Sequence, residues 1–470
     1  MSTHGDTGLD LGVRGLSDVL GRVYPPYTVL IAGHPGSGKT TLAATICYNG
    51  AVQGKKCLYI TFYEDKEKLY SYMEKVGVRL SDVEAKGTFS FLKLPVTLDI
   101  DSLIDVLNKS LSGGFDVVVV DSITVILEAV KDTAEKRSWL LNYFYQLPKV
   151  YNGLLVLISE LPYGEERLEL GPLEFVADAV IVLKQKIEDR YLVRLLEVRK
   201  TRGNPIHVAE VPFTIRDGLG LLVYAPPKIE EIPQQAPELE LVGKVLRNKI
   251  GHLHEDFLVN IHYPPETVYG KEALLAVLAH AVKYGLKVLV ISYVTSPSAL
   301  REALRRLLVA LGISPETVEE LIDKHFVFKA LNPFAYSLEE LAMKEISIIE
   351  EVRPNVVVFH GTHVPGISFD PATYFKELYK QVLYLKQRRV LTVRIGNCVD
   401  ELKCNMESSI SDLTLRVTRR YEENKAQTTI LVYRRFREPT IITEEERTEI
   451  LRELVEFLLS RVSVKPSTGE

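Results

Sequence analysis

The sequence predicts an α/β protein built from two tandem domains, each with a mainly parallel sheet flanked by helices. Three observations lead to this prediction. Continuously apolar runs alternate with helix-like stretches, as in parallel sheets that are covered on both faces. The same order of runs occurs twice along the 470 residues. A glycine-rich loop also joins the first run to the first helix-like stretch.

That loop, GHPGSGKT at residues 33–40, matches G-x-x-x-x-G-K-[ST] and follows the apolar run TVLIA. In this context the backbone N–H groups and the helix N-terminus bind phosphate oxygens, Lys39 reaches the β and γ phosphates, and Thr40 ligates Mg²⁺. The loop therefore predicts a nucleoside triphosphate site. Its expected residues are Gly33, His34, Pro35, Gly36, Ser37, Gly38, Lys39, Thr40 and Thr41.

Six further apolar runs predict the other strands of the first domain, at residues 57–62, 89–94, 116–121, 154–159, 179–183 and 192–198. Asp121 ends the run DVVVVD, where a carboxylate is expected to hold Mg²⁺ through water. Alternatively, Asp121 caps a helix, because an Asp followed by Ser often starts one. Ser159 and Glu160 end the next run, where they either sense the γ-phosphate or lie in a solvated loop.

The segment after residues 57–62 supplies the candidate catalytic base. Hydrolysis needs a carboxylate that orients and deprotonates the attacking water, and this strand end lies at the nucleotide edge of the sheet. Glu64 is the preferred residue, and Asp65 is the second candidate. Alternatively, both acids simply open the following helix, whose dipole favours them there.

Lys200 and Arg202 form a basic pair near the end of the first domain. They flank Thr201 on a predicted strand, so they project from the same face. Isolated basic residues at such a place are usually solvated, but this pair precedes a glycine and indicates a more specific role.

A stretch rich in proline and acids, residues 225–240, predicts an interdomain linker between domains at residues 1–224 and 241–470. After it the apolar runs return, at residues 258–263, 287–293, 326–331, 355–360, 389–395, 413–417 and 428–435.

Matching spacings support a duplication. Lys39 lies 22 residues before Thr61 and Lys271 lies 21 before Ser292. Arg199 likewise follows Asp178 by 21 residues, and Arg434 follows Asp412 by 22. The two halves therefore predict one fold in tandem.

The composition is that of an ordinary globular protein, and a net charge of -5 gives no general attraction to nucleic acid or anionic membranes. The N-terminus lacks a signal-peptide pattern and no run approaches 18 apolar residues, so we expect a cytoplasmic protein. Cys47 and Cys57 predict buried thiols, whereas Cys398 and Cys404 either stay reduced or bridge a loop.

On these residues the chain resembles the KaiC-like branch of the RecA superfamily. The resemblance covers residues 10–224, and the second half looks like a degenerate copy, so that two RecA-like P-loop domains are expected. Its motifs are GLSDVL (15–20), GHPGSGKTTLA, YNG (48–50), TF-x-E (61–64), VVVVDS, FVADAVIVL (175–183) and K-x-RG followed by PFTI (200–215).

The resemblance implies a homo-oligomeric ring, usually hexameric, with ATP and Mg²⁺ between subunits. One subunit then supplies Lys39, Thr40 and Asp121. Its neighbour inserts the basic pair, Lys200 and Arg202, toward the γ-phosphate, which makes hydrolysis depend on assembly.

KaiC-like proteins carry two consecutive glutamates after TF, of which the first serves as the base. Here Tyr63 takes the first position and Glu64 the second, so we expect slow hydrolysis.

The second half departs further, at its loop PETVYGKE (265–272). Pro265 replaces the first glycine, and Glu272 replaces the Mg²⁺-binding hydroxyl, where an acid repels phosphates. His360 stands in place of the Mg²⁺ aspartate, so this domain is not expected to bind ATP. Arg435 and Arg437 are assigned the places of the basic pair, as structural or surface residues.

The leading interpretation is a ring-forming ATPase or ATP-dependent switch whose second domain is a structural ring or a platform for an unidentified protein partner. A DNA-processing accessory protein is the alternative. The segment 160–175, at the place of a DNA-binding loop, holds five Glu and one Arg, which opposes nucleic acid without excluding it. The third interpretation is a regulator that binds nucleotide and hardly hydrolyses it. No membrane attachment is expected.

Overall fold

The computed structural model describes residues 8–95, 100–130, 133–161, 173–188, 191–218, 220–225, 236–266, 271–422 and 425–462. The chain divides into two compact units, Met1–Ala225 and Pro226–Glu470. Each unit has its own mainly parallel sheet flanked by helices, which confirms the predicted fold class.

The first sheet has the strand order β3-β2-β4-β5-β1-β6-β7-β8-β9. In this spatial order, the six strands β3, β2, β4, β5, β1 and β6 pair in parallel. Strands β7, β8 and β9 continue the sheet beyond β6, each antiparallel to its neighbour. Their bounds are β1 Tyr27–Gly33, β2 Cys57–Thr61, β3 Phe89–Lys93, β4 Val117–Asp121, β5 Leu154–Glu160, β6 Ala179–Glu188, β7 Tyr191–Thr201, β8 Glu210–Arg216 and β9 Gly220–Val223.

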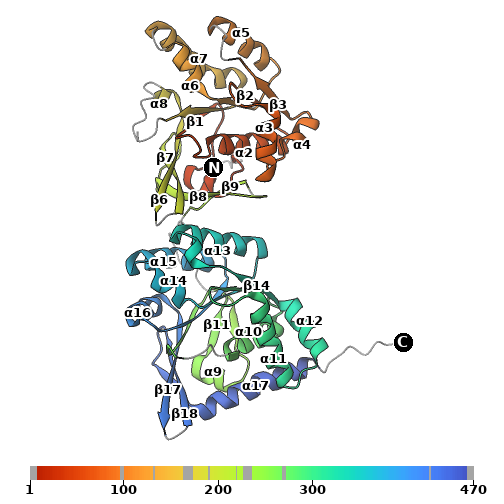
Figure 1. Ribbon diagram of the computed structural model, residues 1–470, viewed down its shortest axis with the longest axis vertical. Coiled ribbons are helices and arrows are strands. Elements are labelled where there is room, and N and C mark those ends of the chain that lie inside the picture. Colours follow the sequence, from red (N-terminus) through yellow and green to blue (C-terminus); the bar gives the residue numbers. More distant parts are fainter. Residues whose placement is uncertain are drawn as a thin grey trace, which may run out of the picture. The chain divides into compact units, whose positions relative to one another are not determined.

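Helices cover both faces of this sheet (Figure 1). Side chains of β1 alternate accordingly: Val29 and Ile31 pack under α1 to α4, whereas Leu30 and Ala32 pack under α5 to α7. The bounds are α1 Leu16–Leu20, α2 Lys39–Val52, α3 Lys66–Lys75, α4 Leu80–Ala85, α5 Ile100–Leu111, α6 Ile123–Ala129, α7 Ala134–Tyr151 and α8 Leu173–Val176.

The second sheet repeats this order, with β14-β13-β15-β16-β12-β17-β18-β19 standing where β3-β2-β4-β5-β1-β6-β7-β8 stand in the first. The bounds are β12 Leu258–Tyr263, β13 Val288–Ser292, β14 Phe326–Ala330, β15 Val356–His360, β16 Leu391–Asn397, β17 Leu413–Glu422, β18 Lys425–Arg434 and β19 Thr440–Ile442. Every apolar run that predicted a strand is a strand.

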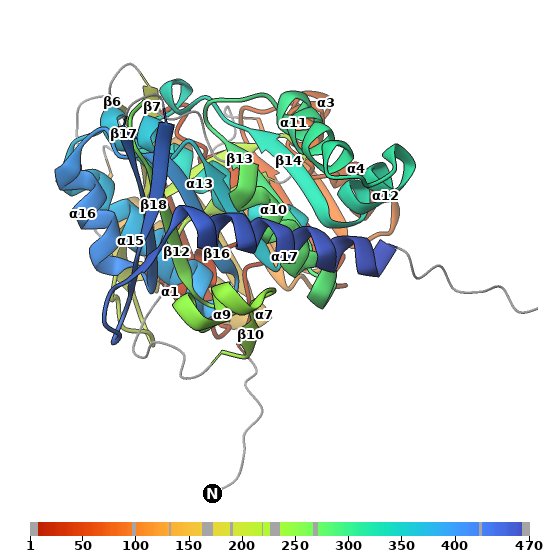
Figure 2. The same cartoon turned by 90° about the horizontal axis from the view of Figure 1, so that it is seen from below.

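In the second unit α13, α14 and α15 lie on one side of the sheet, and α9, α10, α11, α12 and α17 lie on the other (Figure 1). The long helix α17 runs across that face beside α9 and α10 (Figure 2). The bounds are α9 Lys244–Ile250, α10 Lys271–Tyr284, α11 Pro297–Ala310, α12 Pro315–His325, η1 Pro333–Ala335, α13 Leu338–Val352, α14 His363–Ser368, α15 Pro371–Gln387, α16 Glu401–Ile410 and α17 Glu444–Val462.

Two sequence expectations are settled in this region. The predicted linker extends too far, because Glu238–Glu240 form β10, which pairs with β11 (His252–His254). The proline-rich and acidic context hid Leu239, which is buried in the core of the second unit. Cys398 and Cys404 form a disulfide with Cα atoms 5.9 Å apart, while Cys47 and Cys57 are buried free thiols, as predicted.

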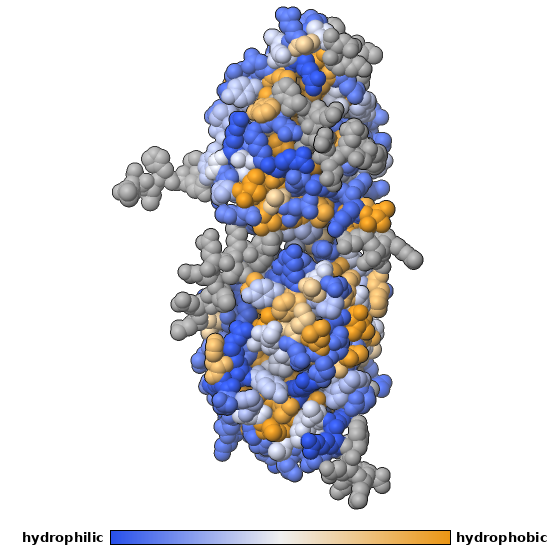
Figure 3. Space-filling model, turned by 90° about the vertical axis from the view of Figure 1, so that its left-hand side faces the viewer, coloured by the Kyte–Doolittle hydropathy of each residue, from blue (hydrophilic) through white to orange (hydrophobic). Residues whose placement is uncertain are grey.

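The face of the molecule drawn in Figure 3 mixes hydrophilic and apolar residues. Such scattered apolar exposure is ordinary for globular domains. Across the part of the chain that the structure describes, none of the helices combines the length and apolar character needed to cross a membrane.

Candidate nucleotide site

The phosphate loop joins β1 to α2, and its glycines are required by backbone geometry. Gly36 and Gly38 have φ angles of 78° and 104°, in the left-handed region that glycine adopts without a steric penalty. A Cβ atom on Gly33 would lie 2.5 Å from the carbonyl oxygen of Leu183. The loop conformation therefore excludes larger residues at these positions.

Lys39 begins α2, and its ammonium group is held against the loop. The Nζ atom donates to the carbonyl oxygen of His34 at 2.8 Å and lies 2.9 Å from Oε2 of Glu160. The Lys39 side chain is only 5% exposed, whereas that of Glu160 is 43% exposed. A nearly buried cation thus has an accessible carboxylate as its counter-charge.

Thr40 and Asp121 meet although β2, β3 and α3 to α5 separate them in the chain. The Thr40 hydroxyl donates to Oδ2 of Asp121 at 3.0 Å, and the Tyr59 hydroxyl donates to the same oxygen at 2.7 Å. Burial raises the pKa of the Asp121 carboxyl, and these two hydrogen bonds act in the opposite direction. Burial also raises the pKa of Tyr59, so this phenol remains a neutral donor that positions the carboxylate.

These residues fit a nucleotide with Mg²⁺. The Thr40 hydroxyl and the Asp121 carboxylate are hard oxygen donors, which suit this ion. Ser37 Oγ is buried and has no hydrogen-bond partner among the described residues. A Cβ on Gly36 would meet nothing within 4 Å, so the loop borders open space there.

Ser159 and Glu160 are not a solvated loop. Ser159 is fully buried, and its hydroxyl lies 3.2 Å from that of Thr124. The Thr124 hydroxyl also accepts from the Glu160 N–H at 2.9 Å, which fixes the strand end where Glu160 faces Lys39.

Glu64 lies in the loop after β2, with its N–H bound to the Thr61 hydroxyl at 3.2 Å. Because Thr61 pairs with Asp121 across the sheet, this loop adjoins the Thr40 and Asp121 pair. The negative charge of Glu64 is a minor contribution to the raised pKa of Tyr59, after burial and the charge of Asp121. Asp65, the second candidate, precedes α3 and its side chain pairs with Lys93, away from this cluster.

Lys200 and Arg202 bind one segment of their own chain. The Lys200 ammonium donates to the carbonyl oxygens of Glu174 and Ala177, both at 2.7 Å. The Arg202 guanidinium donates to Asp178 Oδ1 and to the Phe175 carbonyl oxygen, both at 3.0 Å. Their joint contact with residues 174–178 agrees with the prediction that both project from one face.

Residues 9–228 match the family model described as ATPase: KaiC. The first unit is therefore a KaiC-like domain of the RecA superfamily, and this match spans just under half of the chain. A UPF0273 protein of Aeropyrum pernix is 28% identical over 242 residues, which cover 47% of this chain and 94% of that protein.

Longer matches extend beyond the KaiC-like unit. The circadian clock protein KaiC3 of Synechocystis is 25% identical over 381 residues, 76% of this chain and 72% of KaiC3. KaiC2 of the same organism is 24% identical over 368 residues, 74% of this chain and 62% of KaiC2. Because the first unit contains less than half of the 470 residues, these alignments reach into the second unit.

In the second unit, backbone hydrogen bonds locate the residues equivalent to the phosphate loop. The N–H of Asp178 donates to Thr28, and that of Asp412 donates to Leu258 in the same way. Thr28 therefore corresponds to Leu258. Five residues after these two, Gly33 ends β1 and Tyr263 ends β12, so Tyr263 corresponds to Gly33. The loop that follows β12 is two residues longer than that after β1, residues 264–270 against 34–38.

The prediction that Pro265 replaces the first glycine is therefore wrong. It assumed that this loop has the same length in both units, whereas the second loop is two residues longer. Residues 267–270 and the Lys271 side chain lie outside the described part of the chain. Glu272 is described, and its carboxylate pairs with Arg447 at 2.9 Å.

His360 does take the place of Asp121, as predicted. Thr61 pairs with Asp121 in the first sheet, and Ser292 pairs with His360 in the second. Burial lowers the pKa of His360 to about 4, so its ring is neutral near pH 7. A neutral imidazole therefore stands where the first unit has a carboxylate.

The counterpart of Arg202 is Arg435. The N–H of Arg202 donates to the Asp178 carbonyl, and that of Arg435 donates to the Asp412 carbonyl. The Arg435 guanidinium also lies 3.7 Å from Asp412 Oδ1, as Arg202 binds Asp178.

The assignment of Arg435 and Arg437 to the places of Lys200 and Arg202 was therefore wrong by two residues. Strand register places Tyr433 at the position of Lys200. A bulge between Val180 and Ile181 shifts the first hairpin, and the pairing of β17 with β18 runs without one.

Tyr59 was not among the residues predicted for this site. Its signal was a phenol within an otherwise apolar run, since a buried hydroxyl needs a hydrogen-bond partner. The acidic loop that argues against nucleic acid falls mostly on residues 162–172, which lie outside the described residues.

Proposed function

We propose that the chain binds ATP with Mg²⁺ at residues 33–40 and hydrolyses it slowly, at sites shared between the subunits of a homo-oligomeric ring. The meeting of Lys39, Thr40 and Asp121 at the end of β1 and β4 carries this proposal. Family membership and the fit of these residues to a triphosphate support it.

Lys39 and the loop would bind the phosphates. An ATP molecule brings its own negative charge, so its β and γ phosphates replace Glu160 as the partner of the Lys39 ammonium. The Gly36 to Gly38 backbone and the Ser37 hydroxyl supply donors. When bound at Thr40 and Asp121, Mg²⁺ neutralises phosphate charge.

Glu64 would act as the base. It accepts a proton from a water whose oxygen forms a bond to the γ-phosphorus, while the bond from that phosphorus to the bridging oxygen breaks. The bridging electrons leave with ADP, and phosphate is the second product. Glu64 also has Lys68 at 3.9 Å and is 34% exposed, a solvated setting that favours slow turnover.

The basic pair of a neighbouring subunit would complete the site. Arg202 is half exposed, and its guanidinium reaches its own Asp178 at the surface. Assembly would exchange these internal contacts for the γ-phosphate of the adjoining subunit, so hydrolysis rises with ring formation.

The second domain, residues 241–470, would not bind nucleotide and would serve as a structural ring or partner platform. Its neutral His360 offers no anionic ligand to Mg²⁺, and its Lys200 position holds Tyr433. This part of the proposal predicts one nucleotide per chain.

One set of measurements tests the proposal: molecular mass in solution with and without ATP and Mg²⁺, bound nucleotide per chain, and phosphate release on the same samples. We expect a ring with one nucleotide per chain and slow release that increases with protein concentration. Two nucleotides per chain, or equal turnover by monomers, would contradict it. Ring assembly with bound ATP and no phosphate release would instead favour a non-hydrolysing regulator.

A further inference from the structure

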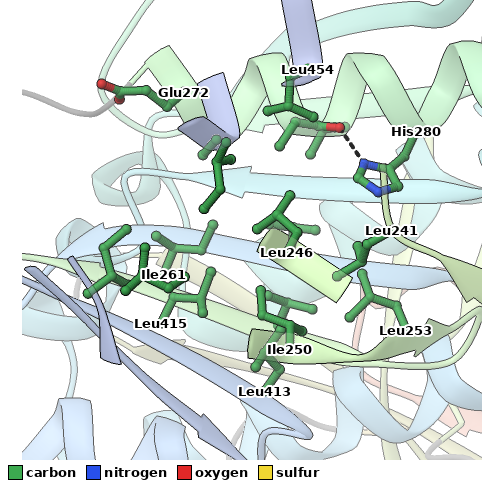
Figure 4. A pocket seen from close by; sticks show the side chains of 18 of the residues that line it. Leu241, Leu246, Ile250, Leu253, Ile261, Glu272, His280, Leu413, Leu415 and Leu454 are labelled. Carbon is green, nitrogen blue, oxygen red and sulfur yellow. Dashed lines mark hydrogen bonds between the residues drawn. The ribbon is translucent and has the colours of Figure 1, made fainter. Parts of the chain in front are cut away.

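The second unit contains a partly open apolar cavity of ≈ 190 Å³ between its sheet and its helices (Figure 4). The sheet wall comes from β12 and β17, and the helix wall comes from α9, α10 and α17. Side chains from the two walls point toward one another across the space, among them Leu246, Ile250, Ile261, Leu413, Leu415 and Leu454.

The walls are buried and apolar, so the space does not suit water. Ile250, Leu413 and Leu454 are each no more than 3% exposed. A water molecule needs two to four polar partners, which aliphatic walls do not offer. An aliphatic cavity of about 150 Å³ takes up benzene, so a cavity of ≈ 190 Å³ accommodates an apolar body of about eight carbons.

The elements that pack against α2 in the first unit and against α10 in the second differ. In the first unit β9 contacts α2, and Phe213 of β8 and Val223 of β9 fill the layer beneath that helix. In the second unit the helix α17 contacts α10 instead. Side chains of α17, among them Leu454, therefore form part of the cavity wall.

The two ends of the cavity differ in polarity. His280 lies at one end, where Nδ1 bonds to the Ala276 carbonyl at 2.6 Å and Nε2 accepts from the Val242 N–H at 2.9 Å. Burial lowers the pKa of His280 to about 4, so this end carries no charge near pH 7.

Glu272, Arg419 and Arg447 line the opposite end. Arg447 is neutralised by ion pairs with Glu272 and Glu444. Within the described residues, Arg419 has no ion pair, and its charge together with that of Arg447 opposes the rise in the pKa of the nearby Tyr263. A cation at the rim of an apolar space favours a molecule with an anionic end.

We propose that the second unit binds a small amphipathic monocarboxylate, with an aliphatic body of about eight carbons in the cavity and its carboxylate at Arg419. The ligand occupies this cavity and contacts α10, which forms part of the cavity wall. Helix α10 follows the loop that is equivalent to the phosphate loop. Nothing in this site depends on nucleotide binding by the first unit.

The test uses the full-length chain with octanoate, octan-1-ol and acetate, measured by calorimetric titration and by the shift of the unfolding temperature. We expect octanoate to bind, octanol to bind more weakly, and acetate not to bind. Absence of binding by both eight-carbon probes would overturn the proposal. Binding of octanol in preference to octanoate would overturn the role of Arg419.

Variants locate the binding. Ala276→Phe and Leu415→Phe fill the cavity from opposite walls, and each should abolish octanoate binding; folding is checked by circular dichroism. Arg419→Gln should weaken octanoate about tenfold and leave octanol unchanged. Arg420→Gln is the matched control, since this neighbour projects from the other strand face. Undiminished octanoate binding in both phenylalanine variants would place the ligand elsewhere and refute the site.

Discussion

Lys39 shows how one side chain can prepare a site for a charged ligand. A nearly buried ammonium needs a counter-charge, and Glu160 supplies it at 2.9 Å. In the proposed ATP complex Glu160 turns outward at little desolvation cost, because its side chain is 43% exposed. The ion pair thus stabilises the loop without blocking it.

Replacing Lys39 with Ala should therefore weaken ATP binding at least about tenfold, since charge-assisted hydrogen bonds to phosphate are lost. Titration with a fluorescent ATP analogue measures this. Lys271→Ala, at the start of α10, is the matched control and should leave affinity and stoichiometry unchanged. Unaltered affinity in the Lys39 variant would remove the loop from the site.

Glu64→Gln should slow phosphate release by about 10²-fold while ATP affinity stays the same, because the amide keeps the shape but cannot accept a proton. Single-turnover hydrolysis separates this effect from binding. Unaffected turnover would shift the role of base to another group, with Glu160 the nearest carboxylate to Lys39.

Tyr63 offers a gain-of-function test at the neighbouring position. Its side chain is 64% exposed, so Tyr63→Glu should fold normally. The variant restores two consecutive acids and should release phosphate faster than the natural chain. A rate equal to or below that of the natural chain would show that slow turnover has another cause.

At the scale of elements, strand register decides which residues of the two halves correspond. Asp178 and Asp412 each bind the backbone of the neighbouring central strand, and this contact fixes the start of each hairpin. The second unit has two extra residues before α10, and the first hairpin has a bulge. Corresponding residues of the two units are therefore not separated by a constant number of positions.

Helix α13 carries a buried acid, Glu345, that makes the second unit sensitive to pH. Its carboxylate accepts from the Tyr293 hydroxyl at 2.5 Å and from the Gln381 amide. Burial raises its pKa to about 7, which these hydrogen bonds and the nearby Arg394 partly oppose. The folded chain therefore keeps a proton that the unfolded chain releases above its ordinary pKa of about 4.3.

Because the folded pKa is raised, the stabilising contribution of Glu345 is complete below about pH 4.3 and is lost as the pH rises toward 7. The loss is on the order of 3 kcal/mol. Glu345→Gln keeps a neutral amide at all pH values, so urea unfolding should show a smaller decline between pH 5 and 8. An identical decline in both proteins would indicate that Glu345 ionises normally.

At the scale of the molecule, the two units share one strand order but differ in the side chains at the ends of their strands. The first unit places Lys39, Thr40 and Asp121 together at the ends of β1 and β4, whereas His360 stands at the position of Asp121 in the second. The second holds the apolar cavity under α17 instead. The two units thus share a strand order, while the residues at corresponding positions differ.

The ring proposal is tested by mixing subunits. Chains with Lys200→Ala and Arg202→Ala keep an intact phosphate loop, and Lys39→Ala chains keep an intact basic pair. In a ring with shared sites, some interfaces combine the two intact halves, so part of the lost hydrolysis should return. No recovery in mixtures shown by mass to co-assemble would refute action across the interface.

The sequence by itself determined the fold class, the tandem order of strands and the phosphate loop. These features are local: a buried parallel strand is a continuous apolar run, and a phosphate loop is eight consecutive residues. They could therefore be predicted without knowing which strands are neighbours.

Tertiary structure alone decided the contacts between distant segments. Glu160 meets Lys39 and Tyr59 meets Asp121 because β5 and β4 lie beside β1 and β2 in the sheet. The correspondence of Arg435 with Arg202 depends on a bulge, and the cavity is lined by helices and strands that are far apart in the chain. Pairing register and packing distance arise between segments far apart in the chain, so no local pattern encodes them.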